Sequence, residues 1–134
     1  MKRAIVAVAL LGTLASLAGC SDFERLDFVF VSTPPLAVTV TYDQIRIPEG
    51  IAVIATARPM AGDAVMDSDT KVDLRSADPG VLGVAFALPQ VLDEGSDDIP
   101  WTHVLFGVHA GSTTVTVRVD DDVKKEIPAV VEPQ

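Results

Sequence analysis

The chain has 134 residues, 49% of them hydrophobic and 22% charged, with a formal net charge of −9. This length suits one domain and is too short for two ordinary domains. The acidic balance excludes binding to nucleic acid or to anionic lipid headgroups through basic side chains, and a single cysteine excludes an internal disulfide.

The first twenty residues form a targeting segment. Lys2 and Arg3 precede an apolar run over 4–17, and the run closes on Leu17-Ala18-Gly19-Cys20. A short apolar run after a basic tip predicts a secretory signal and not a membrane span. The closing tetrapeptide resembles the lipobox of bacterial lipoproteins. The resemblance implies cleavage between Gly19 and Cys20, diacylglycerol on the Cys20 sulfur, and a further acyl chain such as palmitate on the new amine.

These features predict the domain organisation. Residues 1–19 are the lipoprotein signal peptide, residues 20–35 are the lipidated N-terminus and tether, and residues 36–134 are the folded domain. Loss of Lys2 and Arg3 leaves 8 Lys+Arg against 19 Asp+Glu, so the mature charge is −11. By the sorting logic of such lipoproteins, Ser21 favours the outer membrane over the inner membrane, within a periplasmic or surface envelope location.

The tether contains one ambiguous apolar stretch. Pro34-Pro35 stiffens a linker and stops regular structure. Ahead of these prolines, residues 27–31 read Asp-Phe-Val-Phe-Val. This stretch is either a first strand or a peptide that docks on the domain.

From residue 36 the pattern has a period of two. Short runs rich in β-branched residues alternate with Gly, Pro and Asp turns, and they cover residues 36–42, 51–57, 72–75, 104–108, 115–119 and 127–131. This pattern predicts an all-β, immunoglobulin-like sandwich of about seven short antiparallel strands. Val104 and Phe106 are expected to face the core, with Trp101 and His103 on the opposite face.

Two acidic loops interrupt the strands, at residues 60–70 and 88–100. Their carboxylates Asp67, Asp69, Asp97 and Asp98 have the oxygen chemistry of calcium ligands, although no EF-hand spacing is present. Solvated turns are the favoured interpretation of these loops. Asp120-Asp121-Asp122 is interpreted in the same way, as a hairpin turn.

Candidate catalytic residues are sparse. His103 and His109 lie six residues apart, so on one continuous strand they are about 20 Å apart and cannot share a metal. Both are expected at the surface or at a sheet edge. Ser112 follows a turn glycine but lacks a nucleophile-elbow motif. The chain is therefore predicted not to be an enzyme.

Trp101 opens a strand directly after Pro100. It is interpreted either as packing beneath the acidic loop or as an exposed aromatic contact for a partner. The first interpretation is the favoured one.

Two longer motifs point to one family. Residues 72–84 read VDLRSADPGVLGV, and residues 107–117 read GVHAGSTTVTV. Both segments resemble the central and later motifs of bacterial immunoglobulin-like group 2 domains, and the similarity covers about residues 36–131. The resemblance implies a β-sandwich with a binding or architectural role and carries no catalytic residue.

The sequence therefore predicts a lipid-anchored cell-envelope protein with a non-catalytic binding or structural module. Its expected partners are the membrane, through the anchor, and other envelope proteins, with no nucleic acid. No cofactor is expected besides the lipid on Cys20. Two alternatives stay open: a calcium- or ligand-binding module that uses loops 60–70 and 88–100, and an accessory subunit of an envelope complex.

Overall fold

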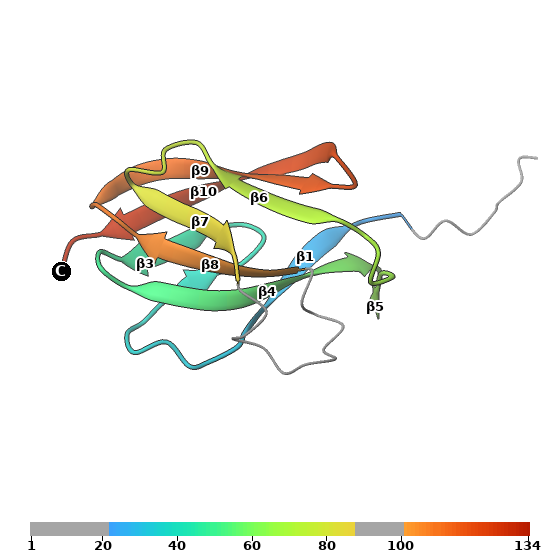
Figure 1. Cartoon of the computed structure of the whole chain (residues 1–134), viewed down its shortest axis with the longest axis horizontal. Coiled ribbons are helices and arrows are strands. Elements are labelled where there is room, and N and C mark those ends of the chain that lie inside the picture. The colour runs from blue at the N-terminus through green and yellow to red at the C-terminus, as the bar shows by residue number, and fades with distance from the viewer. Residues whose placement is uncertain (1–21, 88–100) are drawn as a thin grey trace, which may run out of the picture.

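The computed structural model describes residues 22–87 and 101–134, and these residues form ten β-strands without an α-helix (Figure 1). The all-β prediction is confirmed, with more strands than the seven or so expected. The strands are β1 (Arg25–Phe30), β2 (Thr39–Val40), β3 (Ile45–Pro48), β4 (Ala52–Ala61), β5 (Ala64–Val65), β6 (Val72–Ser76), β7 (Leu82–Phe86), β8 (Thr102–Gly107), β9 (Gly111–Val119) and β10 (Asp122–Glu132).

The strands build two sheets that pack as a sandwich (Figure 1). Sheet A has the order β1-β4-β8-β7, with the short β5 paired to β4, and sheet B has the order β2-β3-β10-β9-β6. One pair, β3 with β10, is parallel, whereas an antiparallel fold was expected throughout. β3 runs in the same direction as β10 and pairs along its free edge, and β2 continues the sheet antiparallel to β3.

The core lies between the sheets and follows the alternation of each strand. Sheet A contributes Val53 and Leu105, and sheet B contributes Val117, Ile127 and Val131, each 3% exposed or less. Alternate residues of a strand point to opposite faces, so burying one face selects one parity in the sequence. The predicted alternation over 115–119 is confirmed, and the β-rich run over 127–131 lies in β10.

Strand β8 buries the opposite face from the one expected. Leu105 pairs with Val53 of β4 and Val84 of β7 and is fully buried, whereas Phe106 is 40% exposed. The expectation was wrong because Val104, Leu105 and Phe106 are three consecutive apolar residues, which carry no alternation of their own. The register with β4 decides which of them faces the core.

The N-terminal stretch belongs to sheet A. β1 pairs with β4 from Arg25 opposite Met60 to Phe30 opposite Ala55, and Leu26 is 2% exposed. Of the two alternatives for this stretch, a first strand is therefore correct. The sandwich begins ahead of residue 36, and the segment expected to be a tether over 20–35 contains an integral edge strand.

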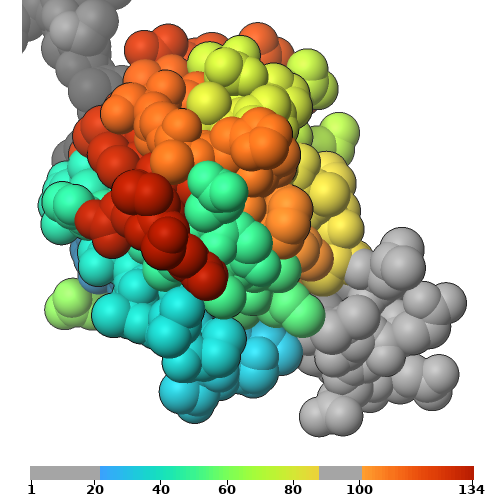
Figure 2. All heavy atoms as spheres, turned by 90° about the vertical axis from the view of Figure 1, so that its left-hand side faces the viewer, coloured from blue at the N-terminus to red at the C-terminus, as the bar shows by residue number. Residues whose placement is uncertain are grey.

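One end of the sandwich, here called the C-terminal end, holds the close of β10 (Figure 2). There the Glu49 N–H donates to the Glu132 carbonyl at 2.8 Å, and the Gln134 side-chain amide donates to the Glu49 carbonyl at 2.7 Å. These bonds join the last residues of the chain to the turn that follows β3. The turn between β8 and β9 lies at the same end (Figure 1).

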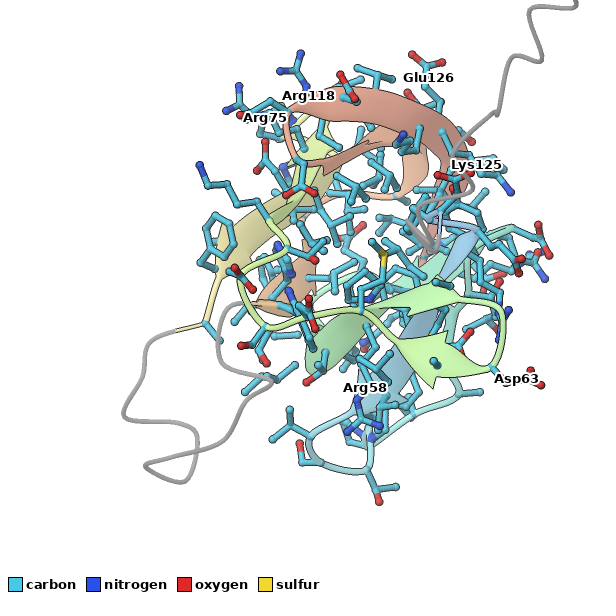
Figure 3. All side chains as sticks on the ribbon, turned by 90° about the vertical axis from the view of Figure 1, so that its right-hand side faces the viewer. Arg58, Asp63, Arg75, Arg118, Lys125 and Glu126 are labelled. Atoms are coloured by element: carbon cyan, nitrogen blue, oxygen red, sulfur yellow. The ribbon has the colours of Figure 1, made fainter. Side chains whose placement is uncertain are left out.

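The opposite end, here called the N-terminal end, holds the start of β1 and the β4–β5 hairpin (Figure 3). The hairpin turns at Gly62, whose φ of 61° suits glycine, and at Asp63. The predicted acidic loop over 60–70 is therefore partly wrong, because its first half is a hairpin. Arg25 Nη1 donates to the Gly62 carbonyl at 3.1 Å, which ties this hairpin to the start of β1.

The β9–β10 turn also lies at the N-terminal end (Figure 1). Asp120 and Asp121 both have positive φ values, 49° and 69°. Two consecutive positive φ values define the type I′ hairpin turn, and aspartate is among the residues that tolerate them. The predicted acidic hairpin turn at Asp120–Asp122 is confirmed.

Candidate functional site

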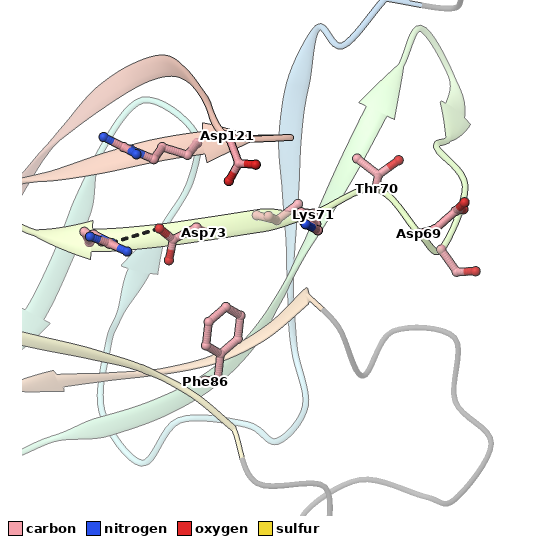
Figure 4. Close-up of a pocket in the computed structure, with 10 residues that line it drawn as sticks. Asp69, Thr70, Lys71, Asp73, Phe86 and Asp121 are labelled. Atoms are coloured by element: carbon pink, nitrogen blue, oxygen red, sulfur yellow. Dashed lines mark hydrogen bonds and ion pairs between the residues drawn. The ribbon is translucent and has the colours of Figure 1, made fainter.

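A groove of about 350 Å³ opens on the side of the sandwich where β6 and β7 are the edge strands of the two sheets (Figure 4). It follows β6, and the aromatic ring of Phe86 from β7 forms its other wall. The groove is lined by Ser68, Asp69, Thr70, Lys71, Val72, Asp73, Arg75, Phe86, Arg118 and Asp121.

Charges in the groove balance. Its three cations, Lys71, Arg75 and Arg118, are matched by three carboxylates, Asp69, Asp73 and Asp121. Arg75 Nε donates to Asp73 Oδ2 at 2.9 Å, so one ion pair is already formed within the groove. A groove with equal numbers of both signs selects neither an anion nor a cation by net charge.

A buried histidine lies behind the Phe86 wall. His103 is 1% exposed, and its ring stacks on Phe86 with the centroids 4.7 Å apart and the planes inclined by 32°. The expectation that His103 lies at the surface or at a sheet edge was wrong. The register of β8 buries the face that carries Leu105, and His103 lies on the same face. His109 is exposed, as expected.

The protonation of His103 follows from its partners. Nδ1 lies 2.8 Å from the Trp101 carbonyl, and because a carbonyl only accepts, Nδ1 carries the proton and donates. Nε2 is buried and has no hydrogen-bond partner. Burial lowers the pKa of His103, against smaller raising effects of the Trp101 carbonyl and Asp73. The imidazole is therefore held neutral.

Trp101 is part of the core. It is 2% exposed, and its indole Nε1 donates to the Thr70 carbonyl at 2.8 Å. This bond fastens the segment that leads into β6 onto the segment that leads into β8. The alternative of an exposed partner contact at Trp101 is wrong, because this side chain is buried. The acidic loop over 88–100 lies outside the described residues, so packing of Trp101 beneath that loop stays a prediction.

The candidate calcium ligands are only partly covered by the described residues. Asp67 and Asp69 are exposed in the segment between β5 and β6, while Asp97 and Asp98 lie outside the described residues. Within 22–87 and 101–134, no group of three His, Cys, Asp or Glu side chains is placed to hold a metal ion. Convergence of the two acidic loops on one calcium ion stays a prediction.

The lipidation and cleavage residues, Cys20 and Gly19, also lie outside the described part of the chain. Ser112, the one serine considered as a nucleophile, pairs with Val130 in the β9–β10 ladder. No helix in the described part of the chain is long and apolar enough to cross a bilayer.

The face of sheet A that points away from the core carries a second feature, which sequence reasoning missed. Val29, Val31 and Phe106 are 40–42% exposed. Val29 pairs with Thr56, two residues from Ile54, and the Val31 N–H donates to the Ile54 carbonyl. Ile54 in turn pairs with Val104, two residues from Phe106, so all five side chains lie on one face. We call these five residues the outer apolar face. The sequence feature that could have indicated this face is the apolar run 104–106. The expectation places Val104 and Phe106 of this run in the core, whereas they lie on the outer face.

Comparison with known proteins places the chain in no family. No family model matches it, and no curated protein matches it. Among solved structures, the crystal structure of domains 4 and 5 of the S-layer protein SbsC is similar, with a TM-score of 0.45 and 19% sequence identity over 79% of this chain. The match spans 54% of that S-layer chain, about half its length. The resemblance to bacterial immunoglobulin-like group 2 domains stays a prediction.

Proposed function

We propose that this chain is a lipid-anchored protein of the bacterial cell envelope whose sandwich is a non-catalytic binding or structural module. The observation that carries the proposal is the segment Leu17-Ala18-Gly19-Cys20, which ends on the only cysteine of the chain. Each acyl CH₂ buried in a bilayer contributes about 0.8 kcal/mol, and two or more chains anchor stably. Acyl chains on Cys20 are therefore sufficient for attachment without basic side chains.

The surface chemistry of the sandwich supports a binding role over a catalytic one. Among the described residues that line the groove, the hydroxyls are Ser68 and Thr70, and no histidine stands beside them as a base. Nucleophilic catalysis needs a nucleophile and a base within hydrogen-bond reach of each other. The neutral His103 lies behind Phe86 and is enclosed.

A second candidate is an accessory subunit of a larger envelope complex. The outer apolar face favours it, because contiguous exposed apolar side chains often mark protein contact sites. Crosslinking in intact cells from Phe106, which lies on this face, is expected to capture a protein. Crosslinks from Phe106 to lipid alone would count against this candidate.

The anchor is tested by expressing the full chain in a bacterial host and measuring the mass of the recovered protein. Loss of residues 1–19 together with addition of acyl chains is the expected result. Cys20→Ser is expected to leave the precursor uncleaved or without lipid, and Ser21→Asp is the matched control, which keeps lipidation and tests sorting to the outer membrane. A native protein that keeps residues 1–19 and carries no fatty acid would overturn the proposal.

A further inference from the structure

We propose that the N-terminal end of the sandwich lies directly on the surface of the bilayer that holds Cys20, and that zwitterionic lipid headgroups are its partner. This inference rests on lipidation of Cys20, the function proposed above. It adds an interaction surface and an orientation, which an anchor on a long flexible linker would not impose.

The sandwich holds Phe23 and Glu24 in place. The ring of Phe23 packs edge-on against Tyr42, with the centroids 6.1 Å apart, and the Glu24 N–H donates to the Met60 carbonyl at 2.8 Å. From Arg25 onward the chain is in the β1–β4 ladder. The sandwich therefore holds the chain from Phe23, three residues after Cys20.

The three residues from Cys20 to Phe23 limit the distance between the lipidated cysteine and the sandwich. A fully extended chain spans at most about 3.6 Å per residue, so Cys20 lies within about 11 Å of Phe23. The polar headgroup layer of one leaflet is about 5–8 Å thick, from the difference between the whole bilayer and its hydrocarbon core. With its acyl chains in the hydrocarbon, Cys20 holds Phe23 at or just above the headgroups.

The β4–β5 hairpin lies at the same end of the sandwich as Phe23. Arg25 ties the start of β1 to the β4–β5 hairpin through the Gly62 carbonyl, so this hairpin lies beside the start of β1. Its tip exposes Asp63, Ala64 and Val65, and Val65 is 47% exposed (Figure 3). The β9–β10 turn lies at the same end (Figure 1).

The charges at this end select the lipid. The exposed carboxylates Asp63, Asp120, Asp121 and Asp122 outnumber the exposed lysines at this end, Lys71 and Lys124. The other cations are already paired: Arg25 is engaged by Asp27 at 2.9 Å and by Glu24 at 3.7 Å, and Lys125 by Asp43 at 2.9 Å. Carboxylates within a Debye length of an anionic surface are repelled, and at 0.1 M salt that length is about 10 Å. Zwitterionic headgroups carry an ammonium group and no net charge, so they accept this end without that repulsion.

The orientation also defines the outward-facing surface. β10 runs for 11 residues from the N-terminal end to the C-terminal end. At about 3.3 Å per residue it spans roughly 35 Å. The C-terminal end therefore projects away from the bilayer, and the outer apolar face stands to the side, accessible to a protein.

Tryptophan fluorescence in vesicles tests the orientation on the full chain. Val65→Trp places a reporter at the N-terminal end, and His109→Trp places a matched reporter at the exposed turn of the C-terminal end. The parent, whose Trp101 is buried, supplies the background. In phosphatidylcholine vesicles with lipids brominated near the headgroup, Val65→Trp is expected to be quenched at least twofold more than His109→Trp. Equal quenching, or stronger quenching at residue 109, overturns the proposal.

Two further variants serve as controls for the fluorescence experiment. Ala64→Trp repeats the measurement at the neighbouring residue in case Val65→Trp folds poorly. Insertion of ten Gly/Ser residues between Ser21 and Asp22 is expected to abolish the difference between the two reporters. A difference that survives this insertion overturns the argument from reach.

Vesicles rich in phosphatidylglycerol are expected to weaken the quenching at residue 65, and high salt is expected to restore it. Stronger quenching at residue 65 in these anionic vesicles overturns the choice of lipid.

The mass of the same preparations separates this inference from the proposed function. A protein with acyl chains on Cys20 but equal quenching at both ends keeps the anchor and removes the orientation. A protein without acyl chains removes the proposed anchor. Its free Cys20 thiol is then coupled to a maleimide lipid in the same vesicles, and the two reporters are compared as before, so that orientation is decided in either case.

Discussion

Phe86 covers His103, with the centroids of the two rings 4.7 Å apart. Phe86 is 57% exposed, whereas His103 is 1% exposed. Register creates this contact, because Phe86 pairs with His103 across the β7–β8 ladder. Ala55 pairs with His103 on the opposite side, from β4. An ionisable ring is thus enclosed between two apolar neighbours, which keeps it neutral.

We expect the free energy of unfolding to fall as the pH drops below about 6.5, the ordinary pKa of histidine. Burial lowers the pKa of His103 in the folded state, so in this range the unfolded chain binds more protons than the folded chain. Stability is therefore complete above the unfolded pKa and is lost as the pH falls toward the folded pKa. Urea unfolding at pH 7.5 and pH 5.5 measures the loss. His103→Phe is expected to reduce this pH-dependent loss of the free energy of unfolding. The exposed-site control His109→Phe is expected to leave the loss unchanged.

Leu105→Asp is expected to unfold the domain, whereas Phe106→Asp is expected to be tolerated. Leu105 is fully buried between the sheets and Phe106 is 40% exposed on the outer apolar face. An unpaired charge in the core costs several kcal/mol, and a charge at a half-exposed position costs about 1 kcal/mol or less. Thermal melting followed by circular dichroism compares the two variants. Greater damage from Phe106→Asp would contradict the register of β8.

Gly107→Ala is expected to destabilise the fold by about 1–3 kcal/mol, the usual cost of overpacking. A Cβ at Gly107 would lie 2.5 Å from the Pro48 carbonyl oxygen, so the backbone of one sheet must move away from the other. Gly83→Ala is the control, because a Cβ there meets its nearest neighbours at 3.8 Å, which is ordinary contact. Urea midpoints measure both variants, and a neutral Gly107→Ala would mean that the two segments are not in close contact.

Millimolar calcium is expected to leave the melting temperature of the full chain unchanged. The described residues hold no cluster of three potential metal ligands, and Asp67 and Asp69 are exposed. A ligand that binds only the folded state raises the melting temperature, because it adds RT ln(1 + [L]/Kd) to the free energy of unfolding. A rise that disappears in an Asp67→Asn, Asp69→Asn double variant would instead establish a calcium site in these loops.

Alternation made most of the sandwich predictable. Val115, Val117 and Val119 are separated by polar residues, so a single parity is apolar and burial has one solution. The Asp120-Asp121 turn was recognisable because short acidic residues suit a two-residue hairpin.

The positions that could not be predicted have a common physical origin. In Val104-Leu105-Phe106 both parities are apolar, and pairing with strands distant in the sequence decides which one is buried. The neutral His103 could not be anticipated, because its burial depends on that same register. β1 was ambiguous because a lone apolar stretch does not reveal which strand it will pair with, here β4.

β1 starts at the N-terminal end of the sandwich and β10 finishes at the C-terminal end (Figure 1), with β1 hydrogen-bonded along the edge of sheet A and β10 parallel to β3 in sheet B. Tension applied between the start of β1 and the end of β10 therefore runs along the strands, and the hydrogen bonds of the ladders lie perpendicular to this tension. Under such shear the bonds of a ladder carry the load together instead of opening one by one. This topology therefore makes the sandwich mechanically resistant to tension applied between the start of β1 and the end of β10.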